Sequence, residues 1–392
     1  MDVSEFESPA HEEVQADLRT LFRGAIRMTL EALLEEEVRE LVGAGRWQRM
    51  VGRVDVRNGS YLRTLVTTAG PVDVVVPRTR HSGSAGDVLG RYKRRSGELD
   101  EAITSAYVQG VSTRKMSKVT RALMGEDVSR STVSRVTRTL EEKVEGLRTQ
   151  PLTQAFPYLY LDATFLDARW ARTVQSVSAL VAYGVGEDGH RHLLAVTLGG
   201  SESVDSWLEL LRQLLERGLR GVRLVIADGH AGLAAAARQA LPEARLQRCT
   251  VHLTRNVLAK APWRLRGRLG KETSAVFEAA SLLDARKRLE ALQEGLGRQV
   301  PEAMECLREG FAAATCFFSF PKAHWKRLRS TNGLERLHGE VKRRIRSVGA
   351  FPDRASALRL ITAVALEVTG VWDDRRYLDM ALLKSTPDTA AV

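Results

Sequence analysis

Three acidic residues stand where a carboxylate is unfavourable unless it is paired or binds a cation. Asp162 interrupts residues 158–165, an otherwise apolar segment that predicts a buried strand. Asp228 follows the apolar run 222–227, and ligands and catalytic groups collect just past the carboxyl ends of buried strands. Glu335 lies in a segment with helical periodicity, beside its apolar stripe. These three residues are the candidate catalytic set.

A set of carboxylates predicts the chemistry of hard cations, which take oxygen ligands. Mg²⁺ fits best, and Mn²⁺ can substitute for it. Two such ions about 4 Å apart stabilise both the attacking and the leaving oxygens at a phosphodiester. Asp162, Asp228 and Glu335 are therefore predicted to be the ligands of two Mg²⁺ ions that act on a phosphodiester.

Each acid also has a simpler interpretation when it is taken alone. An Asp at a strand end often caps the next helix, and a charged residue on a helix face is usually solvated. Their combination favours the catalytic interpretation, because a small sheet would place the strands of Asp162 and Asp228 side by side. On the helix of Glu335, one face beside the apolar stripe carries Glu335, Lys342 and Arg346 together.

The elements that position these acids follow from hydrophobic periodicity. After Pro151 and Pro157 the pattern predicts three strands, a helix, a strand and a helix, at residues 158–165, 174–185, 191–198, 203–217, 222–227 and 231–240. Residues 241–330 show no strand character and predict helices only. A helix over 331–347 and a pair of helices over 354–380 follow.

The N-terminal part predicts helices around a short β segment. The expected elements are a helix at 14–42, strands at 61–68 and 72–76, and helices at 98–109, 113–124 and 131–144. The loop after the second strand is strongly basic and includes Arg91, Lys93 and Arg94.

The segment 125–132 resembles the turn of a helix-turn-helix. The helix after it would present polar and basic side chains to a DNA groove, namely Ser131, Thr132, Ser134, Arg135 and Arg138. An ordinary helical hairpin with a solvated basic face is the alternative.

The composition favours an anionic partner in a reducing compartment. Lys and Arg number 59 against 48 Asp and Glu, a formal net charge of +11, which is typical of nucleic-acid binding. Three cysteines imply no disulfide framework. The acidic N-terminus lacks the pattern of a secretory signal, and no long apolar run predicts a membrane-spanning helix. We expect a cytoplasmic, nucleoid-associated protein with no membrane partner and no small-molecule substrate.

Cys249, His252 and Trp325 each allow more than one role. The Cys249/His252 spacing is half of a zinc site, but Cys306 and Cys316 are distant and irregular in spacing. A buried, hydrogen-bonded histidine is the plainer interpretation of His252. Trp325 could stack on a displaced base or simply belong to the core.

Several of these motifs together resemble the mutator-type bacterial insertion-sequence transposases. The likeness spans roughly residues 15–380 and includes Leu-Asp-Ala-Thr around Asp162, Ala-Asp-Gly-His around Asp228, Cys-Thr-Val-His at 249–252 with Arg255 and Asn256, and Ser-Thr-Asn-Gly-Leu-Glu-Arg-Leu at 330–337. Four further motifs also match, namely Arg57-Asn-Gly, Val-Pro-Arg78, Gly110-Val-Ser-Thr-Arg-Lys and Trp372 with Arg375-Arg-Tyr. Gly333 and His338 depart from the residues common in relatives.

The resemblance implies a DDE transposase, with a fold class and an activity to match. The fold would be an α/β catalytic core with a ribonuclease-H-like mixed sheet and an all-α insertion, preceded by a helical DNA-binding region. The activity would free a 3′-OH at a transposon end, and that 3′-OH would attack a second phosphodiester. Cys249 and His252 would lie beside the active site, with Asn332 and Lys342 as further supporting residues.

The expected partners are double-stranded DNA, at the transposon ends and the target, and a second copy of the chain, since two DNA ends must be synapsed. The helix at 14–42 is the expected dimer contact. The candidate DNA-contacting residues are Arg57, Arg78, Arg114, Lys115, Ser131, Thr132, Ser134, Arg135, Arg138, Arg255, Trp325, Arg336, Arg343 and Arg346. The expected regions are 1–45 (helix), 46–97 (basic β region), 98–150 (helix-turn-helix), 151–240 and 331–392 (catalytic core) and 241–330 (insertion).

Two other functions share these features. One is a DNA-binding regulator derived from a transposase with a decayed site, although all three acids are present. The other is a structure-selective nuclease that cuts but does not join. The predicted helix-turn-helix and the long N-terminal region favour recognition of a particular DNA end, which a nuclease needs less.

Overall fold

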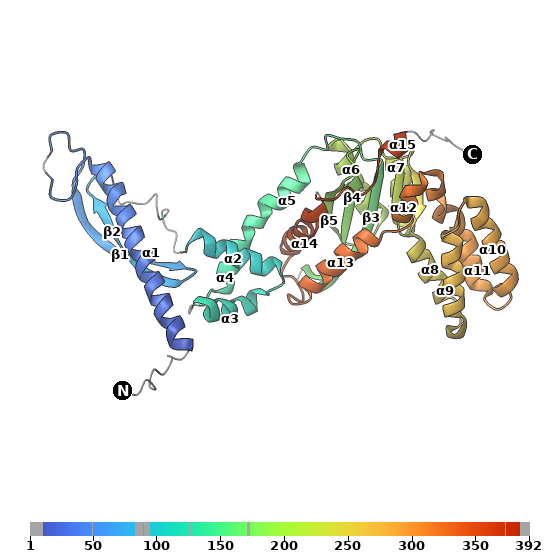
Figure 1. Cartoon of the computed structure of the whole chain (residues 1–392), viewed down its shortest axis with the longest axis horizontal. Helices are drawn as coiled ribbons and strands as arrows, with labels where there is room; N and C mark the ends of the chain where they lie inside the picture. Colours follow the sequence, from blue (N-terminus) through green and yellow to red (C-terminus); the bar gives the residue numbers. More distant parts are fainter. Residues whose placement is uncertain are drawn as a thin grey trace, which may run out of the picture. The chain divides into compact units, whose positions relative to one another are not determined.

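The structure, a computed structural model, describes residues 11–48, 50–82, 89, 95–124, 127–170, 173–372 and 374–384. The contacts divide the chain into two units, Met1–Arg138 and Thr139–Val392, which are described separately (Figure 1). Arg91, Lys93 and Arg94 of the predicted basic loop lie outside the described residues.

The first unit begins with a helix packed on a hairpin. Helix α1 (His11–Val42) confirms the predicted helix, and β1 (Arg57–Thr67) pairs antiparallel with β2 (Gly70–Thr79). The core between them is made by one stripe of α1 and the inward residues of the hairpin, namely Leu34, Val38, Val42, Leu65, Val72, Val74 and Val76. Asp55 fastens the end of the hairpin, because its carboxylate accepts backbone hydrogen bonds from Val56, His81 and Ser82.

Three short helices complete the first unit, and one prediction here was wrong. Helices α2 (Gly97–Val108), α3 (Thr113–Met124) and α4 (Arg130–Val136) contact one another. The helix predicted over 131–144 is two helices, because α4 ends at a 3₁₀ turn, Thr137–Thr139, before α5 (Leu140–Thr149). The hydroxyl of Thr137 bonds to the carbonyl of Ser134 (3.2 Å), the kind of local bond that competes with a continuous helix.

A mixed five-stranded sheet with the order β5-β4-β3-β6-β7 forms the centre of the second unit. The first three strands are an antiparallel meander of β3 (Tyr158–Trp170), β4 (Thr173–Val185) and β5 (Arg191–Gly199). Strands β6 (Leu224–Ala227) and β7 (Arg245–Arg248) run parallel to β3. The protein is therefore of the mixed α/β class, as predicted.

Strand β7 was not predicted, because the residues 241–330 were expected to hold helices only. Its sequence, Arg-Leu-Gln-Arg, lacks the apolar run of a buried strand. The strand forms by pairing with the edge of β6, and the buried side chain of Gln247 has its hydrogen bonds satisfied. The amide of Gln247 donates to the carbonyl of Ala314 (2.8 Å) and accepts from the backbone nitrogen of Phe317 (2.8 Å).

Helices cover both faces of the sheet. Helices α6 (Val204–Glu216) and α7 (Ala231–Ala240) pack together over the face that carries Leu159 and Leu161. Because side chains alternate along a strand, Tyr158, Tyr160 and Asp162 point to the other face. Helices α13 (Asn332–Ile345) and α14 (Arg354–Thr369) contact β3, and α14 also contacts α5 and β5.

A helical insertion separates β7 from α13 and has a core of its own (Figure 1). It consists of α8 (Thr250–Ala259), α9 (Trp263–Phe277), α10 (Leu282–Leu296) and α11 (Pro301–Ala314). Two 3₁₀ turns, Cys316–Ser319 and Lys322–His324, and the short helix α12 (Trp325–Leu328) lead back to the sheet.

The C-terminal part differs from the predicted pair of helices over 354–380. Helix α14 ends at Thr369, a 3₁₀ turn follows at Gly370–Trp372, and α15 spans Ala381–Lys384. Within the described ranges one segment, Arg354–Trp372, is long and apolar enough to cross a membrane by length and composition. Half of it is buried, and its packing is that of a core helix.

Gly189 couples the hairpin between β4 and β5 to this C-terminal segment. Its φ is +82°, and its carbonyl accepts hydrogen bonds from the backbone nitrogens of Tyr377 (2.8 Å) and Leu378 (3.1 Å). A Cβ at this position would collide with the carbonyl oxygen of Leu378.

We expect Gly189→Ala to lower the free energy of unfolding of the second unit by more than about 1 kcal/mol, measured by urea denaturation.

Gly267 provides the matched control for this substitution. It lies on an exposed stretch of α9, and nothing would touch a Cβ there. Gly267→Ala should raise the stability by about 0.5–1 kcal/mol, because alanine is the better helix former. Equal unfolding midpoints for the two variants would contradict the steric argument.

Candidate active site

Asp162 is a nearly buried carboxylate in the middle of β3. The residue is 6% exposed, and its side chain lies on the sheet face toward α13. The Nδ1 atom of His338, a buried residue of α13, lies 3.4 Å from its Oδ2 atom. His338 was noted in the sequence only as a departure from the family pattern. The structure makes it the direct neighbour of the first predicted metal ligand.

Asp228 lies next to Asp162 because β6 is the parallel neighbour of β3. The last paired residues are Tyr160 and Ile226, so Asp162 and Asp228 each follow two residues later along adjacent strands. Asp228 is only partly exposed, and its Oδ1 atom accepts a hydrogen bond from the backbone nitrogen of His230 (3.0 Å). The carboxylate thus helps to form the turn before α7. It does not cap that helix, contrary to the simpler interpretation, because the N-cap residue of α7 is His230, which has no side-chain cap hydrogen bond.

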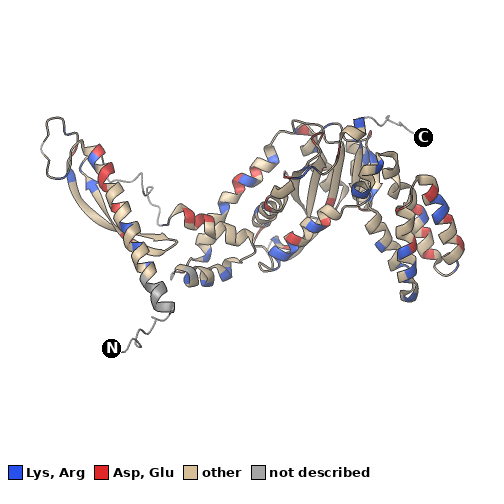
Figure 2. Cartoon of the chain, in the orientation of Figure 1, with Lys and Arg blue, Asp and Glu red and all other residues tan. Residues whose placement is uncertain are grey.

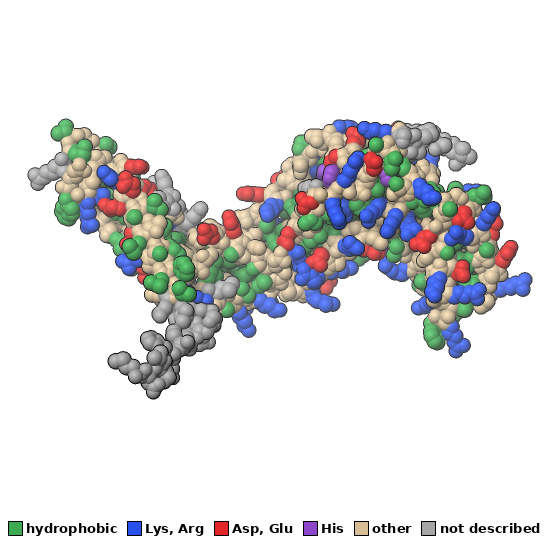
Figure 3. All heavy atoms as spheres, viewed as in Figure 1, with side chains coloured by type: hydrophobic (Ala, Val, Ile, Leu, Met, Phe, Trp, Pro, Cys, Tyr) green, Lys and Arg blue, Asp and Glu red, His purple; other side chains and the backbone are tan. Residues whose placement is uncertain are grey.

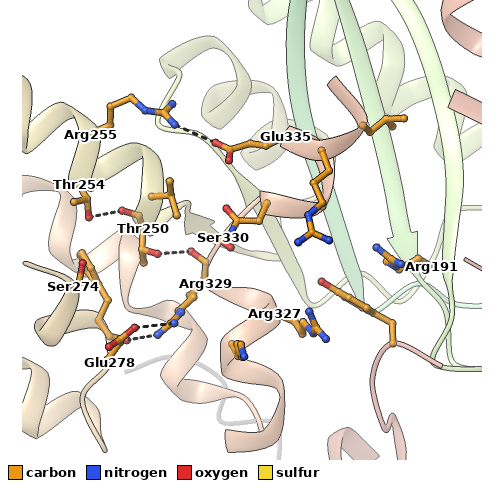
Figure 4. A pocket seen from close by; sticks show the side chains of 18 of the residues that line it. Arg191, Thr250, Thr254, Arg255, Ser274, Glu278, Arg327, Arg329, Ser330 and Glu335 are labelled. Atoms are coloured by element: carbon orange, nitrogen blue, oxygen red, sulfur yellow. Dashed lines mark hydrogen bonds and ion pairs between the residues drawn. The ribbon is translucent and has the colours of Figure 1, made fainter. Parts of the chain in front are cut away.

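Glu335 lies in the first turn of α13, where a helix favours negative charge. Its Oε1 atom is 3.4 Å from the Nε2 atom of His252. The same atom is 3.4 Å from the Nη2 atom of Arg255 (Figure 4). The apolar stripe predicted for this helix is confirmed, because Leu334, Leu337, Val341 and Ile345 are buried. The two cationic groups come from α8, so the helical insertion supplies one side of the site.

Glu202 is a fourth carboxylate that the sequence analysis missed. It precedes α6, its side chain is 11% exposed, and its Oε1 atom is buried without a hydrogen-bond partner. The Nδ1 atom of His230 lies 3.8 Å away. Burial raises the pKa of the Glu202 carboxyl, and the charges of Asp228 and Asp162 raise it further. A single glutamate in a Gly-Ser loop gave no signal in the sequence.

The charges of the acids affect one another and the neighbouring histidine. The negative charges of Asp228 and Asp162 both act on Glu202 and raise the pKa of its carboxyl. Interaction with Cys249 raises the pKa of His252, and the nearby Asp162 and Glu335 charges add to the rise. Within the part of the chain that the structure describes, no three acidic, histidine or cysteine side chains form a metal-ligating group.

The donor set nevertheless fits a hard cation. All four acids offer oxygen ligands, and two of them, Asp162 and Glu202, are largely removed from water. The charges of Asp228 and Asp162 act to raise the pKa of the Glu202 carboxyl, and a bound cation would balance such a concentration of negative charge. Asp162, Asp228 and Glu335, with Glu202 beside them, are the residues that could hold one.

Cys249 connects the start of α8 to the residue that precedes α13 through hydrogen bonds. It is fully buried at the start of α8, and its sulfur accepts hydrogen bonds from the backbone nitrogen (3.4 Å) and hydroxyl (3.5 Å) of Thr331. Burial acts to raise the pKa of the thiol, but hydrogen bonds with His252 and Thr331 outweigh it, so the pKa is lowered. Thr331 immediately precedes α13, so this contact anchors the helix that carries Glu335.

The cationic residues predicted on and around α13 divide into exposed and paired groups. Arg336, Lys342 and Arg346 are exposed, as is Asn332. Arg343 instead pairs with Glu340 (2.7 Å). Figure 2 marks Lys and Arg positions in blue along the ribbon of α13, and Figure 3 shows basic side chains gathered over the region of α12 and α13.

Trp325 is largely engaged in packing. Its indole nitrogen donates to the carbonyl of Phe320 (2.7 Å), and its ring meets Phe317 and Phe318 edge to face. These contacts are those expected if Trp325 belongs to the core.

In the first unit the predicted DNA-contacting residues have different surroundings. Arg57 pairs with Glu35 of α1 (2.7 Å), and Arg78 stacks on Tyr61 at 4.4 Å from the ring centroid. The other candidates are exposed on α3, on α4 and in the turn after it, namely Arg114, Lys115, Ser131, Ser134, Arg135 and Arg138. Thr132 is half-buried, and its backbone nitrogen donates to the capping hydroxyl of Ser129 (3.2 Å).

A cavity of about 1290 Å³ adjoins Glu335, between the helical insertion and the sheet (Figure 4). Its lining includes Asn332 and Gly333 at the start of α13 and Trp372 and Tyr377 from the C-terminal segment. The carboxylate site therefore opens on one side into a space large enough for part of a substrate.

Comparison with known proteins identifies a family and several named relatives. The family described as "Transposase, Mutator family" matches residues 2–374. The transposase for insertion sequence element ISRM5 of Rhizobium meliloti is 36% identical over 91% of this chain and 90% of its own length. The transposase for IS1081 of Mycobacterium tuberculosis is 36% identical over 93% and 88%. The transposase for IS256 in transposon Tn4001 of Staphylococcus aureus is 34% identical over 88% and 90%.

These matches cover nearly the whole chain. The chain therefore belongs to the Mutator family of transposases.

The Cys249 contact gives a test of how α13 is held. In Cys249→Ala, the amide and hydroxyl of Thr331 lose their buried acceptor, and we expect the free energy of unfolding to fall by about 1–2 kcal/mol. Cys249→Ser keeps an acceptor and should recover part of the loss. Guanidinium denaturation measures both variants. A serine variant less stable than the alanine variant would show that the packing of the sulfur matters, and not the bonds it accepts.

Proposed function

We propose that this chain binds the terminal inverted repeats of an insertion sequence and catalyses metal-dependent cleavage and joining of DNA strands through Asp162, Asp228 and Glu335. The observation that carries the proposal is the placement of Asp162 and Asp228 at matching positions on adjacent parallel strands, under the helix that bears Glu335. These residues are far apart in the sequence, and the chain belongs to a transposase family.

The sheet supports a ribonuclease-H-like core for this chemistry. Three antiparallel strands are followed by two strands parallel to the first, in the order β5-β4-β3-β6-β7. The helical insertion lies between the second aspartate and the glutamate, as the resemblance implies.

Asp162, Asp228 and Glu335 would hold two Mg²⁺ ions, and Mn²⁺ would substitute for them. When bound, such ions stabilise the charge on the attacking and leaving oxygens of the phosphodiester. The protein's own side chains orient the acids. His338 lies against Asp162, and His252 and Arg255 lie against Glu335. These contacts fix the carboxylates before substrate arrives.

The first unit would recognise the DNA ends. Helices α2, α3 and α4 contact one another, and α4 buries Val133 and Val136 while exposing Ser134 and Arg135. This arrangement supports a helix-turn-helix whose exposed face meets the DNA groove. Its exposed basic residues would bind phosphates and give a salt-dependent affinity.

A homodimer is the expected active form, because two DNA ends must be held together. Helix α1 supports this proposal, since Leu21, Phe22 and Met28 are 69%, 60% and 72% exposed. A contiguous exposed apolar face of this kind marks an interaction surface. Sedimentation of the intact chain as a monomer at every concentration would contradict it.

The decisive experiment uses a plasmid that carries the DNA flanking the gene. Purified protein and Mg²⁺ should release 3′-OH groups at the element's ends and join them to a second strand. Asp228→Asn should reduce both steps at least about 10³-fold, because a metal-bound transition state loses a charged ligand. Asp167→Asn, an exposed acid on the same strand as Asp162, is the matched control and should react normally.

The products also separate the two alternatives. End-specific binding with no cleavage in Mg²⁺ or Mn²⁺ would indicate a decayed, DNA-binding regulator. Cleavage without end specificity or joining would indicate a nuclease.

Metal binding can be measured without any reaction. A cation that binds only the folded state at a hundredfold excess over its Kd stabilises the protein by about 2.7 kcal/mol. We expect Mg²⁺ or Mn²⁺ to raise the Tm of the wild type and of Asp167→Asn, and to leave Asp162→Asn nearly unchanged. Equal shifts in all three proteins would contradict a cation site at Asp162.

A further inference from the structure

The cavity beside Glu335 carries a surplus of positive charge. Its cationic lining comes from β5, α8, α12, α13 and the residue that follows α12, namely Arg191, Arg255, Lys326, Arg327, Arg329 and Arg336. Its acids are Glu278 and Glu335. Since these elements come from distant parts of the chain, only the tertiary structure assembles this charge.

The two acids already have cationic partners. Glu278 lies 3.2 Å from Arg329, and Glu335 lies 3.4 Å from Arg255 (Figure 4). Among the described residues, no carboxylate forms an ion pair with Arg191, Lys326, Arg327 or Arg336. The cavity therefore holds four positive charges that no carboxylate of the described ranges neutralises by an ion pair.

Arg191 is the most constrained of these groups. Its guanidinium lies 4.2 Å from the ring centroid of Trp372 and 4.5 Å from that of Tyr377, and its Nε atom is buried without a hydrogen-bond partner. Contact with two aromatic rings stabilises a cation and fixes its orientation. Arg191 is thus pre-positioned in the cavity and still has hydrogen bonds to donate.

Arg327 adds a second guanidinium to the same place. It lies 4.8 Å from the centroid of Tyr377, the ring that Arg191 also contacts. Two guanidiniums on one ring repel each other unless an anion lies between or beside them. A guanidinium binds phosphate through paired hydrogen bonds, so a phosphate is the anion that these groups suit best.

We propose that this cavity binds the phosphates of a single DNA strand that leaves the carboxylate site past Glu335. The inference rests on the proposed function and deepens it by naming the form of the DNA. A duplex carries its phosphates on the outside of a wide cylinder, whereas Arg191 is half-buried and recessed. A separated strand is narrow enough to enter, and a basic groove with aromatic side chains is typical of such binding.

The test measures the affinity of the full-length protein for a fluorescent oligo(dT) strand, with a chelator present so that no cleavage occurs. The variants are Arg191→Gln and Arg327→Gln. Arg212→Gln, an exposed arginine of α6 outside this cavity, is the matched control. We expect each cavity variant to bind about tenfold more weakly, because a charge-assisted hydrogen bond is lost.

The salt dependence separates a phosphate contact from a structural effect. Each lost contact with a single strand should lower the slope of log K against log salt by about 0.7. Arg191→Lys, which keeps the charge, should retain the slope. Arg327 is exposed, so Arg327→Gln tests the proposal even if Arg191→Gln fails to fold.

Three results would overturn the inference. The first is wild-type affinity and slope in Arg327→Gln. The second is an equal loss for a duplex of the same length, which would indicate a duplex surface. The third is displacement of the oligonucleotide by inorganic phosphate at comparable concentration, which would indicate a small-anion site. If the wild-type protein cleaves the element's ends while any of these results holds, the cavity proposal fails and the transposase proposal stands. If the wild-type protein does not cleave but binds oligo(dT) through the cavity as expected, the transposase proposal fails and the cavity proposal stands.

Discussion

The parallel pairing of β3 with β6 is the constraint on which the candidate site depends. Three backbone-paired residues set the register, and two residues later the strands deliver Asp162 and Asp228 to neighbouring positions. Helices α6 and α7 fill the opposite face with apolar side chains, which leaves the acidic face for α13. A shift of one residue in β3 would turn Asp162 toward the apolar core, so the packing of Leu159 and Leu161 protects the geometry of the acids.

Bringing carboxylates together on the partly buried inner strands of the sheet is electrostatically unfavourable, and contacts with neighbouring side chains offset this cost. His338 contacts Asp162, His252 and Arg255 contact Glu335, and His230 contacts Glu202. The insertion provides two of these groups, and it is joined to the core at Cys249–Thr331. Residues of α8 and α13, which meet at this junction, also line the cationic cavity. The packing of the insertion on the core therefore positions both the cations beside Glu335 and those of the cavity.

Much of the local structure could be predicted from periodicity alone. The strands and helices between residues 158 and 240, the long helix α1 and the apolar stripe of α13 all have regular patterns, and the structure contains them. The failures have physical reasons. Strand β7 is polar and is held by the edge of β6 and by the bonds of Gln247. The break after α4 depends on local hydroxyl bonding that periodicity does not register.

The candidate catalytic residues could be picked out from the amino-acid order alone, because an acid inside or at the end of an apolar strand is conspicuous in one dimension. Glu335 and the Cys249/His252 pair could be identified through their motifs. The groups that surround these residues became evident only from the folded chain. Glu202, His338, Arg191 and Arg327 occupy ordinary positions in the sequence, and they meet the acids or the cavity only after strands and helices from distant segments pack together. Electrostatic contacts depend on distance in space, and separation along the chain does not reveal it.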